Sequence, residues 1–229
     1  MTQFIDALSG SWLPVGSNQD EVFVVLGRAF ADNVLVKYCG GDGEAMNRLI
    51  EGESNLYLVN YRQGKVAAVA WLFFAPEKEP YKIWVPGLGK VEPEKTLRQA
   101  WQGLRVLGLW AFLRSAAFVV EAERVLEGLH GRDVVHLNCL AVDPEFQGQK
   151  IAKQFMASLI EWCRSHGLTL CLTAESKNWD FYYKFGPDEA RDFVLADPCY
   201  WLPWYLKPPW VRQTAPPEYK AFLFRPIRT

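Results

Sequence analysis

Val135–Lys153 (VHLNCLAVDPEFQGQKIAK) carries more information about the architecture than any other segment of this 229-residue chain. Its first half belongs to an apolar run, Asp133–Val142, which predicts a buried strand that ends at Asp143-Pro144. Its second half enters an amphipathic helix, predicted over Gly148–His166 and stopped by Gly167. The segment therefore predicts a strand, a short turn and a long helix in succession.

The turn between these elements, Gln147-Gly148-Gln149, has the features of an anion-binding site. Backbone N–H groups in the first turn of a helix are free to bind a phosphate, and the helix dipole favours negative charge there. Gly148 permits close approach to the backbone, and Lys150 and Lys153 add two cations. The P-loop and dinucleotide-binding glycine patterns are absent. Most strand–turn–helix junctions with one glycine bind nothing. Spacing alone therefore does not distinguish an anion-binding turn from an ordinary connection.

Upstream of this segment, the chain predicts two helices, a β-hairpin and a helical insertion. The helices span 19–31 and 42–52, and the strands 55–61 and 66–74 are joined by a turn at 62–65. A proline- and glycine-punctuated loop is predicted at 76–93. Residues 95–129 have helical periodicity between two β regions, which indicates a helical insertion at about 93–130.

Downstream, a strand is predicted at Leu168–Ala174 and a short helix at Lys177–Phe185. Further strands are expected at 193–196 and 199–206, before a Trp- and Pro-rich tail at about 201–229. We therefore expect one mixed α/β domain over residues 1–229, in which a single sheet is flanked by helices.

Composition and charge exclude several classes of protein. Lys and Arg total 25 against 26 for Asp and Glu, so no strong field favours nucleic acid. Half of the residues are hydrophobic, which excludes an intrinsically disordered chain. The most apolar stretch, Val106–Val120, is interrupted by Arg114 and is too short to span a bilayer, so we expect no stable membrane association. Five cysteines without metal-ligand spacing indicate reduced thiols, a cytoplasmic location and no bound metal.

Two motifs resemble those of the GNAT superfamily of acetyl-CoA-dependent N-acetyltransferases. Leu140–Ala152 (LAVDPEFQGQKIA) resembles motif A, and Asn178–Gly186 (NWDFYYKFG) resembles motif B with the spacing of puromycin-type acetyltransferases. The resemblance implies a single mixed, mostly antiparallel sheet flanked by helices, with acetyl-CoA as the acyl donor. Two positions depart from the pattern: Lys150 replaces a glycine of the anion turn, and Pro187 replaces an aromatic residue.

The resemblance also implies roles for particular residues. The strand residues Leu140, Ala141 and Val142 would pair with the pantetheine arm, and Asn178 would contact the pantetheine or the ribose phosphate. Tyr182 would protonate the departing thiolate, although a buried packing role is the alternative, with Tyr183 as a fallback. The pyrophosphate would lie on the turn, at the residues Gln147, Gly148, Gln149, Lys150, Ile151, Ala152 and Lys153.

His136 is the candidate general base, because the pKa of histidine lies near neutrality and HLNCLAV resembles the corresponding strand of aralkylamine acetyltransferases. Period-two alternation predicts that His136 faces the same side as Asn138 and Leu140, toward the thioester, whereas Cys139 faces the opposite side. A histidine buried in the core is the alternative for His136. Cys139 is expected to be a core residue and no nucleophile.

The leading functional hypothesis is an N-acetyltransferase that moves acetyl from acetyl-CoA to a small-molecule primary amine in a ternary complex. A peptide or protein N-acetyltransferase and a non-catalytic acyl-CoA-binding domain are the alternatives. The protein is expected to be a monomer or a homodimer. Tryptophans in the insertion and tail are hypothesised to wall an apolar or aromatic amine pocket, with core packing as the alternative: Trp101, Trp110, Trp201, Trp204 and Trp210.

Overall fold

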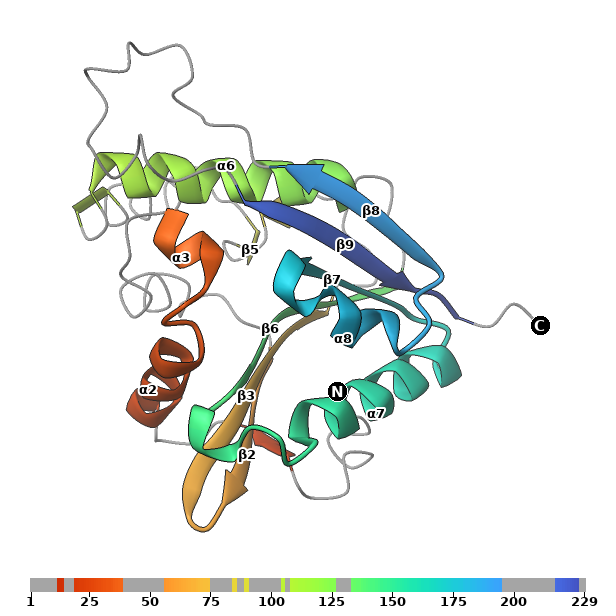
Figure 1. Ribbon diagram of the computed structural model, residues 1–229. Coiled ribbons are helices and arrows are strands. Elements are labelled where there is room, and N and C mark those ends of the chain that lie inside the picture. The colour runs from red at the N-terminus through yellow and green to blue at the C-terminus, as the bar shows by residue number, and fades with distance from the viewer. Residues whose placement is uncertain are drawn as a thin grey trace.

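The computed structural model describes residues 12–14, 19–38, 56–74, 84–85, 89–90, 104–105, 108–126, 133–194 and 217–226. In these residues seven strands form one sheet in the order β1-β2-β3-β6-β7-β9-β8 (Figure 1). Every neighbouring pair is antiparallel except β6 and β7, which are parallel. The expected mixed, mostly antiparallel sheet is confirmed. Its strands are β1 (Trp12–Pro14), β2 (Leu56–Arg62), β3 (Lys65–Phe74), β6 (Val134–Val142), β7 (Thr169–Glu175), β8 (Glu189–Val194) and β9 (Glu218–Phe224).

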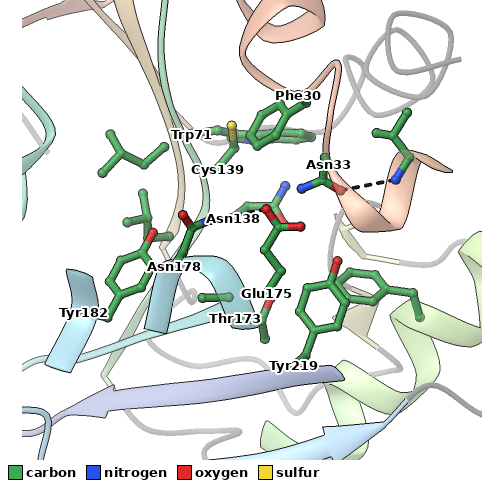
Figure 2. Close-up of a pocket in the computed structure, with 15 residues that line it drawn as sticks. Phe30, Asn33, Trp71, Asn138, Cys139, Thr173, Glu175, Asn178, Tyr182 and Tyr219 are labelled. Atoms are coloured by element: carbon green, nitrogen blue, oxygen red, sulfur yellow. Dashed lines mark hydrogen bonds between the residues drawn. The ribbon is translucent and has the colours of Figure 1, made fainter. Parts of the chain in front are cut away.

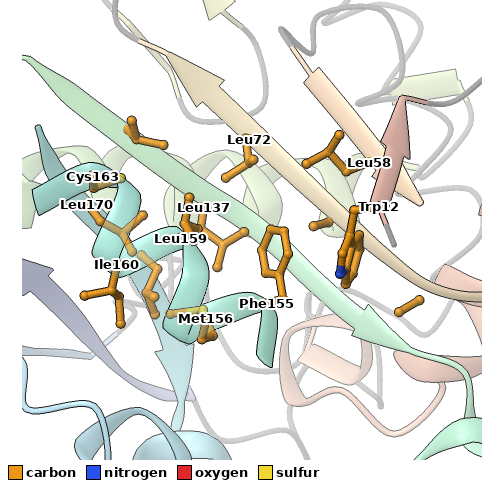
Figure 3. Packing of buried hydrophobic residues seen from close by; sticks show 14 of the residues in the cluster. Trp12, Leu58, Leu72, Leu137, Phe155, Met156, Leu159, Ile160, Cys163 and Leu170 are labelled. Atoms are coloured by element: carbon orange, nitrogen blue, oxygen red, sulfur yellow. The ribbon is translucent and has the colours of Figure 1, made fainter. Parts of the chain in front are cut away.

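Helix α7 (Ile151–Ser165) covers one face of the sheet. Its apolar stripe, which follows the 3.6-residue period, places Phe155, Met156 and Leu159 fully inside the core. Figure 3 shows these side chains against alternate residues of the strands, and the ring of Phe155 lies 4.4 Å from that of Trp12. Burying each such side chain contributes about 1.5–3 kcal/mol, so this layer is a main source of stability.

Three helices cover the opposite face. Helix α2 (Gln19–Ala29) packs on β2, β3 and β6 through residues that include Phe23 and Leu26. Helices α3 (Val34–Tyr38) and α6 (Leu109–Leu126) pack on β7, β8 and β9. The sheet is therefore the middle layer of three.

The remaining short elements connect or terminate these layers. They are the two-stranded sheet β4 (Trp84–Val85) and β5 (Gly89–Lys90), the 3-10 turns η2 (Pro144–Phe146) and η3 (Ser176–Asn178), and helix α8 (Trp179–Tyr183). In the described part of the chain, no helix is both long enough and apolar enough to cross a lipid bilayer.

Most predicted elements are confirmed, with shifted ends. The hairpin turn has left-handed backbone at Gln63 and Gly64, with φ of 53° and 75°, as a two-residue hairpin turn requires. Helix α6 begins directly after Gly108, whose left-handed φ of 78° marks the helix boundary. The predicted helix at 42–52 and strand at 199–206 lie outside the described residues. The short β4–β5 sheet was missed, because 76–93 was expected to be a loop.

The C-terminal tail needs the largest correction. Residues 201–229 were expected to be a Trp- and Pro-rich tail that follows the last strand, but β9 within them lies between β7 and β8 in the sheet. The predicted strand at 193–196 corresponds to the end of β8. Proline-rich composition before β9 obscured the alternating pattern of Glu218–Phe224, in which Tyr219, Ala221 and Leu223 face the α6 layer.

Candidate active site

An opening in the sheet lies where β6 and β7 separate. The two strands pair from Val134↔Thr169 to Leu137↔Leu172, and the ladder ends there. β6 continues to Val142 and remains paired with β3, whereas β7 continues to Glu175 and remains paired with β9. Between the diverging ends, the β7-facing edge of β6 is available to an extended ligand, as an added strand would use it.

A β-bulge in β6 sets which side chains face this opening. Trp71 pairs with Cys139 but the next residue, Leu72, pairs with Leu137, so Asn138 is the extra residue. The bulge reverses the alternation of side chains along β6. The His136 side chain therefore lies on the same face of the sheet as those of Cys139 and Ala141, and Leu140 lies on the opposite face. The prediction that His136 shares a face with Leu140 and opposes Cys139 is wrong, because regular alternation does not hold across a bulge.

The opening contains a pocket that passes between the two faces of the sheet (Figure 2). Leu137 and Leu140 belong to the α7 side, whereas Cys139 and Tyr219 belong to the α2 and α6 side. Nine elements or connections supply the lining, which is why no short sequence window reveals it. The lining residues are Phe30, Asn33, Val36, Trp71, Phe118, Leu137, Asn138, Cys139, Leu140, Thr173, Ala174, Glu175, Asn178, Tyr182 and Tyr219.

Tyr182 occupies the α8 side of this pocket. Its ring packs on Phe222, with the ring centroids 5.5 Å apart, and meets Phe181 edge-on at 5.0 Å. Burial raises the pKa of the Tyr182 phenol above its usual range, and the nearby Cys139 and Glu175 raise this pKa further. The phenol is therefore protonated at neutral pH and is chemically suited to donate a proton.

Cys139 lines the same pocket but is unsuited to nucleophilic attack. Burial raises the pKa of its thiol, so the reactive thiolate is suppressed at neutral pH. The thiol packs against the α2 side of the core. It functions here as a small apolar wall residue.

Glu175 is the last residue of β7 and contributes a buried carboxylate to the pocket. Its side chain is 3% exposed, and Figure 2 shows it pointing into the space between Asn138 and Tyr219. Lys177 Nζ lies 2.5 Å from Glu175 Oε1, and Asn178 Nδ2 donates to the same oxygen at 3.5 Å. Among the described residues that line the pocket, Glu175 alone carries a formal charge.

The predicted anion turn lies at the far end of β6. Gly148 and Lys150 both have left-handed backbone, with φ of 80° and 62°, so α7 begins at Ile151 and not at Gly148. Residues 147–150 are exposed, and the N–H groups of the first turn of α7 lie next to them. Exposed backbone at the start of a helix, next to left-handed residues, is an arrangement that can bind an anion.

Side chains from α2 and from the two residues that flank η2 hold this turn in place. Asp143 is buried, and its Oδ1 accepts a hydrogen bond from the Glu145 N–H at 2.9 Å. Arg28 of α2 approaches Asp143 Oδ2 at 3.0 Å, and Gln147 Nε2 donates to the Val142 carbonyl at 3.4 Å. The turn is therefore braced against both β6 and α2.

The structure brings some of the predicted site residues together and separates others. Tyr182, Leu140 and Asn178 line one pocket, and the turn continues from the same strand. His136 is buried, does not line the pocket, and has its pKa lowered by burial to about 4. Trp110 does not line the pocket either, and the other four hypothesised tryptophans lie outside the described residues.

Several residues that line the pocket had not been singled out from the sequence. No role was predicted for Trp71, Glu175, Phe118 or Tyr219. One available signal was Glu175 at the end of an otherwise uncharged strand, where a buried charge requires a partner. Phe118 and Tyr219 are 101 positions apart in the chain, and only the fold brings their rings to 5.1 Å.

Comparisons with known proteins agree with this architecture. The profile of the acetyltransferase (GNAT) family matches residues 38–186. An apo mutant of agmatine N-acetyltransferase is 14% identical with a TM-score of 0.58, covering 93% of this chain and 98% of that chain. Drosophila melanogaster polyamine N-acetyltransferase is 12% identical with a TM-score of 0.54, covering 93% and 98%. Arylalkylamine N-acetyltransferase 2 from Aedes aegypti is 14% identical with a TM-score of 0.55, covering 93% and 97%. No curated protein matches the sequence significantly.

Proposed function

Since the chain belongs to the GNAT acetyltransferase family, an acyltransferase family with acyl-CoA donors, we propose that it transfers acetyl from acetyl-CoA to a primary amine of a small molecule. The observation that carries this proposal is the pocket at the β6–β7 opening, with Tyr182 on its wall. Such an opening admits a thioester beside a proton donor. Aromatic walls on several sides suit a compact acceptor better than a long peptide.

Acetyl-CoA fits the backbone features of the site. The pantetheine arm would pair with the β6 edge along Leu140, Ala141 and Val142, where β7 no longer pairs. The diphosphate would bind the turn that starts at Gln147, with Lys150 and Lys153 as nearby cations. Asn178, on the pocket wall, would contact the pantetheine.

The proposed reaction is direct transfer in a ternary complex. The neutral amine attacks the thioester carbonyl carbon, a C–N bond forms and the C–S bond breaks. Tyr182 gives its proton to the departing thiolate. It is reprotonated by the proton that the attacking nitrogen loses as the amide forms. Cys139 takes no part, because its raised pKa keeps the thiol neutral.

CoA release measured with a panel of amines tests this proposal. The panel contains an arylalkylamine, an aliphatic diamine, a lysine-containing peptide and a sample without amine, with products identified by mass spectrometry. We expect turnover on small amines and an acetylated product. Turnover on the peptide alone, or acetyl-CoA binding with no turnover on any amine, would contradict the proposal. A stable acetyl group on Cys139 after incubation with acetyl-CoA alone would contradict direct transfer.

A further inference from the structure

We infer that Glu175 binds the ammonium group of the acceptor and takes its proton before acetyl transfer, an inference that rests on the proposed function. The residue is well placed for contact with an acceptor. It lies opposite Tyr219 in the β7–β9 register, on the strand that diverges from the proposed pantetheine-binding edge of β6. In Figure 2 its carboxylate points into the pocket across from Tyr182, which belongs to α8.

The charge distribution of the pocket favours a cationic acceptor. A buried carboxylate is stable only with compensating positive charge or hydrogen bonds. Lys177 compensates it from the surface, because its side chain is half exposed and is not part of the lining. All other described lining residues are formally neutral, so the Glu175 carboxylate, whose Oε1 is paired with Lys177, is the one charged group that a ligand meets in the described lining.

Aromatic rings in the same pocket indicate the chemistry of the part of the acceptor that lies next to its ammonium group. Trp71, Phe30, Phe118 and Tyr219 come from four different elements or connections and line the same pocket. Ring faces attract cations and also pack against apolar carbon. This combination fits a primary amine that is protonated at neutral pH and carries an aromatic or apolar body.

The proton balance assigns one of the two nitrogen protons to Glu175. The acceptor enters as an ammonium ion, and its first proton passes to the Glu175 carboxylate, which becomes a carboxylic acid. The nitrogen lone pair then attacks the thioester, and the second proton reaches the thiolate by way of Tyr182. Glu175 afterwards releases its proton to solvent, so one amide, one thiol and one proton are formed.

Other polar and titratable groups face Glu175 and have to be considered when the pH dependence of the reaction is measured. They are Lys177 of η3, Asn178, Tyr182 of α8, Tyr219 of β9, and Asn138 and Cys139 of β6. Tyr182 and Cys139 have raised pKa values. The Tyr182 phenol and the Cys139 thiol therefore stay neutral near pH 7 and contribute no change of charge there.

The first test compares Glu175→Gln with Glu161→Gln, a matched substitution at an exposed position of α7. We expect E175Q to lower kcat/KM for the amine by about 10²–10³-fold at pH 7, with an unchanged Kd for acetyl-CoA. The deficit should shrink as pH rises toward the pKa of the amine, because solution then supplies the neutral acceptor. Wild-type kcat/KM and a wild-type pH profile in E175Q would overturn the inference.

A second test uses the wild-type protein, so it does not depend on whether the variant folds. Phenethyltrimethylammonium and its uncharged carbon isostere are compared as inhibitors competitive with the amine. We expect the cation to inhibit at least about tenfold more strongly, and equal inhibition would overturn the inference. These outcomes differ from failure of the proposed function, in which the wild-type protein acetylates no small amine.

Discussion

Leu137 and Cys139 lie two positions apart on β6, yet they face opposite sides of the sheet. Leu137 is in register with Leu72, and Cys139 is in register with Trp71, the adjacent residue of β3. Asn138 forms the bulge between them, next to the point where the β6–β7 ladder ends. This single extra residue places the side chains of Cys139 and His136 on the same face of the sheet, and of the two only Cys139 lines the pocket.

Replacing Tyr182 by Phe should lower kcat by about 10²–10⁴-fold and leave the Kd for acetyl-CoA unchanged. The substitution keeps the ring that packs on Phe222 and removes only the proton donor. Steady-state kinetics with calorimetry of acetyl-CoA binding would check this. Tyr183→Phe is the matched control, since Tyr183 is exposed and does not line the pocket. An unchanged kcat in Y182F would show that Tyr182 is not the general acid.

Replacing Lys150 by Gly should stabilise the protein by about 0.5–1 kcal/mol. Lys150 has a left-handed φ of 62°, which costs a residue with a Cβ about 1–2 kcal/mol, and the extra chain entropy of glycine offsets part of the gain. Denaturant titration measures the free energy of unfolding. Lys150→Ala loses the same charge but retains the Cβ, so equal stabilities of the two variants would contradict the backbone explanation.

Acid should destabilise the protein through His136. Burial lowers its pKa to about 4, whereas the unfolded chain has a histidine pKa of about 6.5, so the unfolded state binds more protons in this window. The contribution of His136 to the free energy of unfolding is fully present above about pH 6.5. It declines by about 3 kcal/mol as pH falls to about 4. Denaturant titrations across this range should give a flatter pH dependence for His136→Gln than for His166→Gln, in which an exposed histidine is replaced. Equal slopes in the two variants would contradict the lowered pKa.

Replacing Phe118 by Ala should raise the KM for an aromatic amine about five- to tenfold without changing the KM for acetyl-CoA. Phe118 is the residue of α6 that lines the pocket, and its ring lies 5.1 Å from that of Tyr219. Phe112→Ala on the same helix is the control, because Phe112 does not line the pocket. Equal effects of the two substitutions on the amine KM would indicate that α6 acts only through stability.

The elements that could be predicted are those whose signals are local. The strand at 133–142, the hairpin around Gly64 and the amphipathic helix that begins near 150 are each visible in neighbouring residues. β9 was missed because its hydrogen-bonding partner β7 is more than 40 positions away and its alternation follows a proline-rich segment. The start of α7 was misplaced because a lysine does not signal a left-handed conformation.

The amino-acid sequence by itself determined the family and the mixed sheet, and it located Tyr182 and the turn proposed to bind the diphosphate, since these depend on short motifs and regular periodicity. Only the tertiary structure decided which side chains surround the proposed thioester site. A bulge at Asn138 reversed the alternation of β6, and divergence of β6 from β7 opened the sheet. Glu175, Phe118 and Tyr219 meet there because distant segments pack together, a relationship that no local pattern encodes.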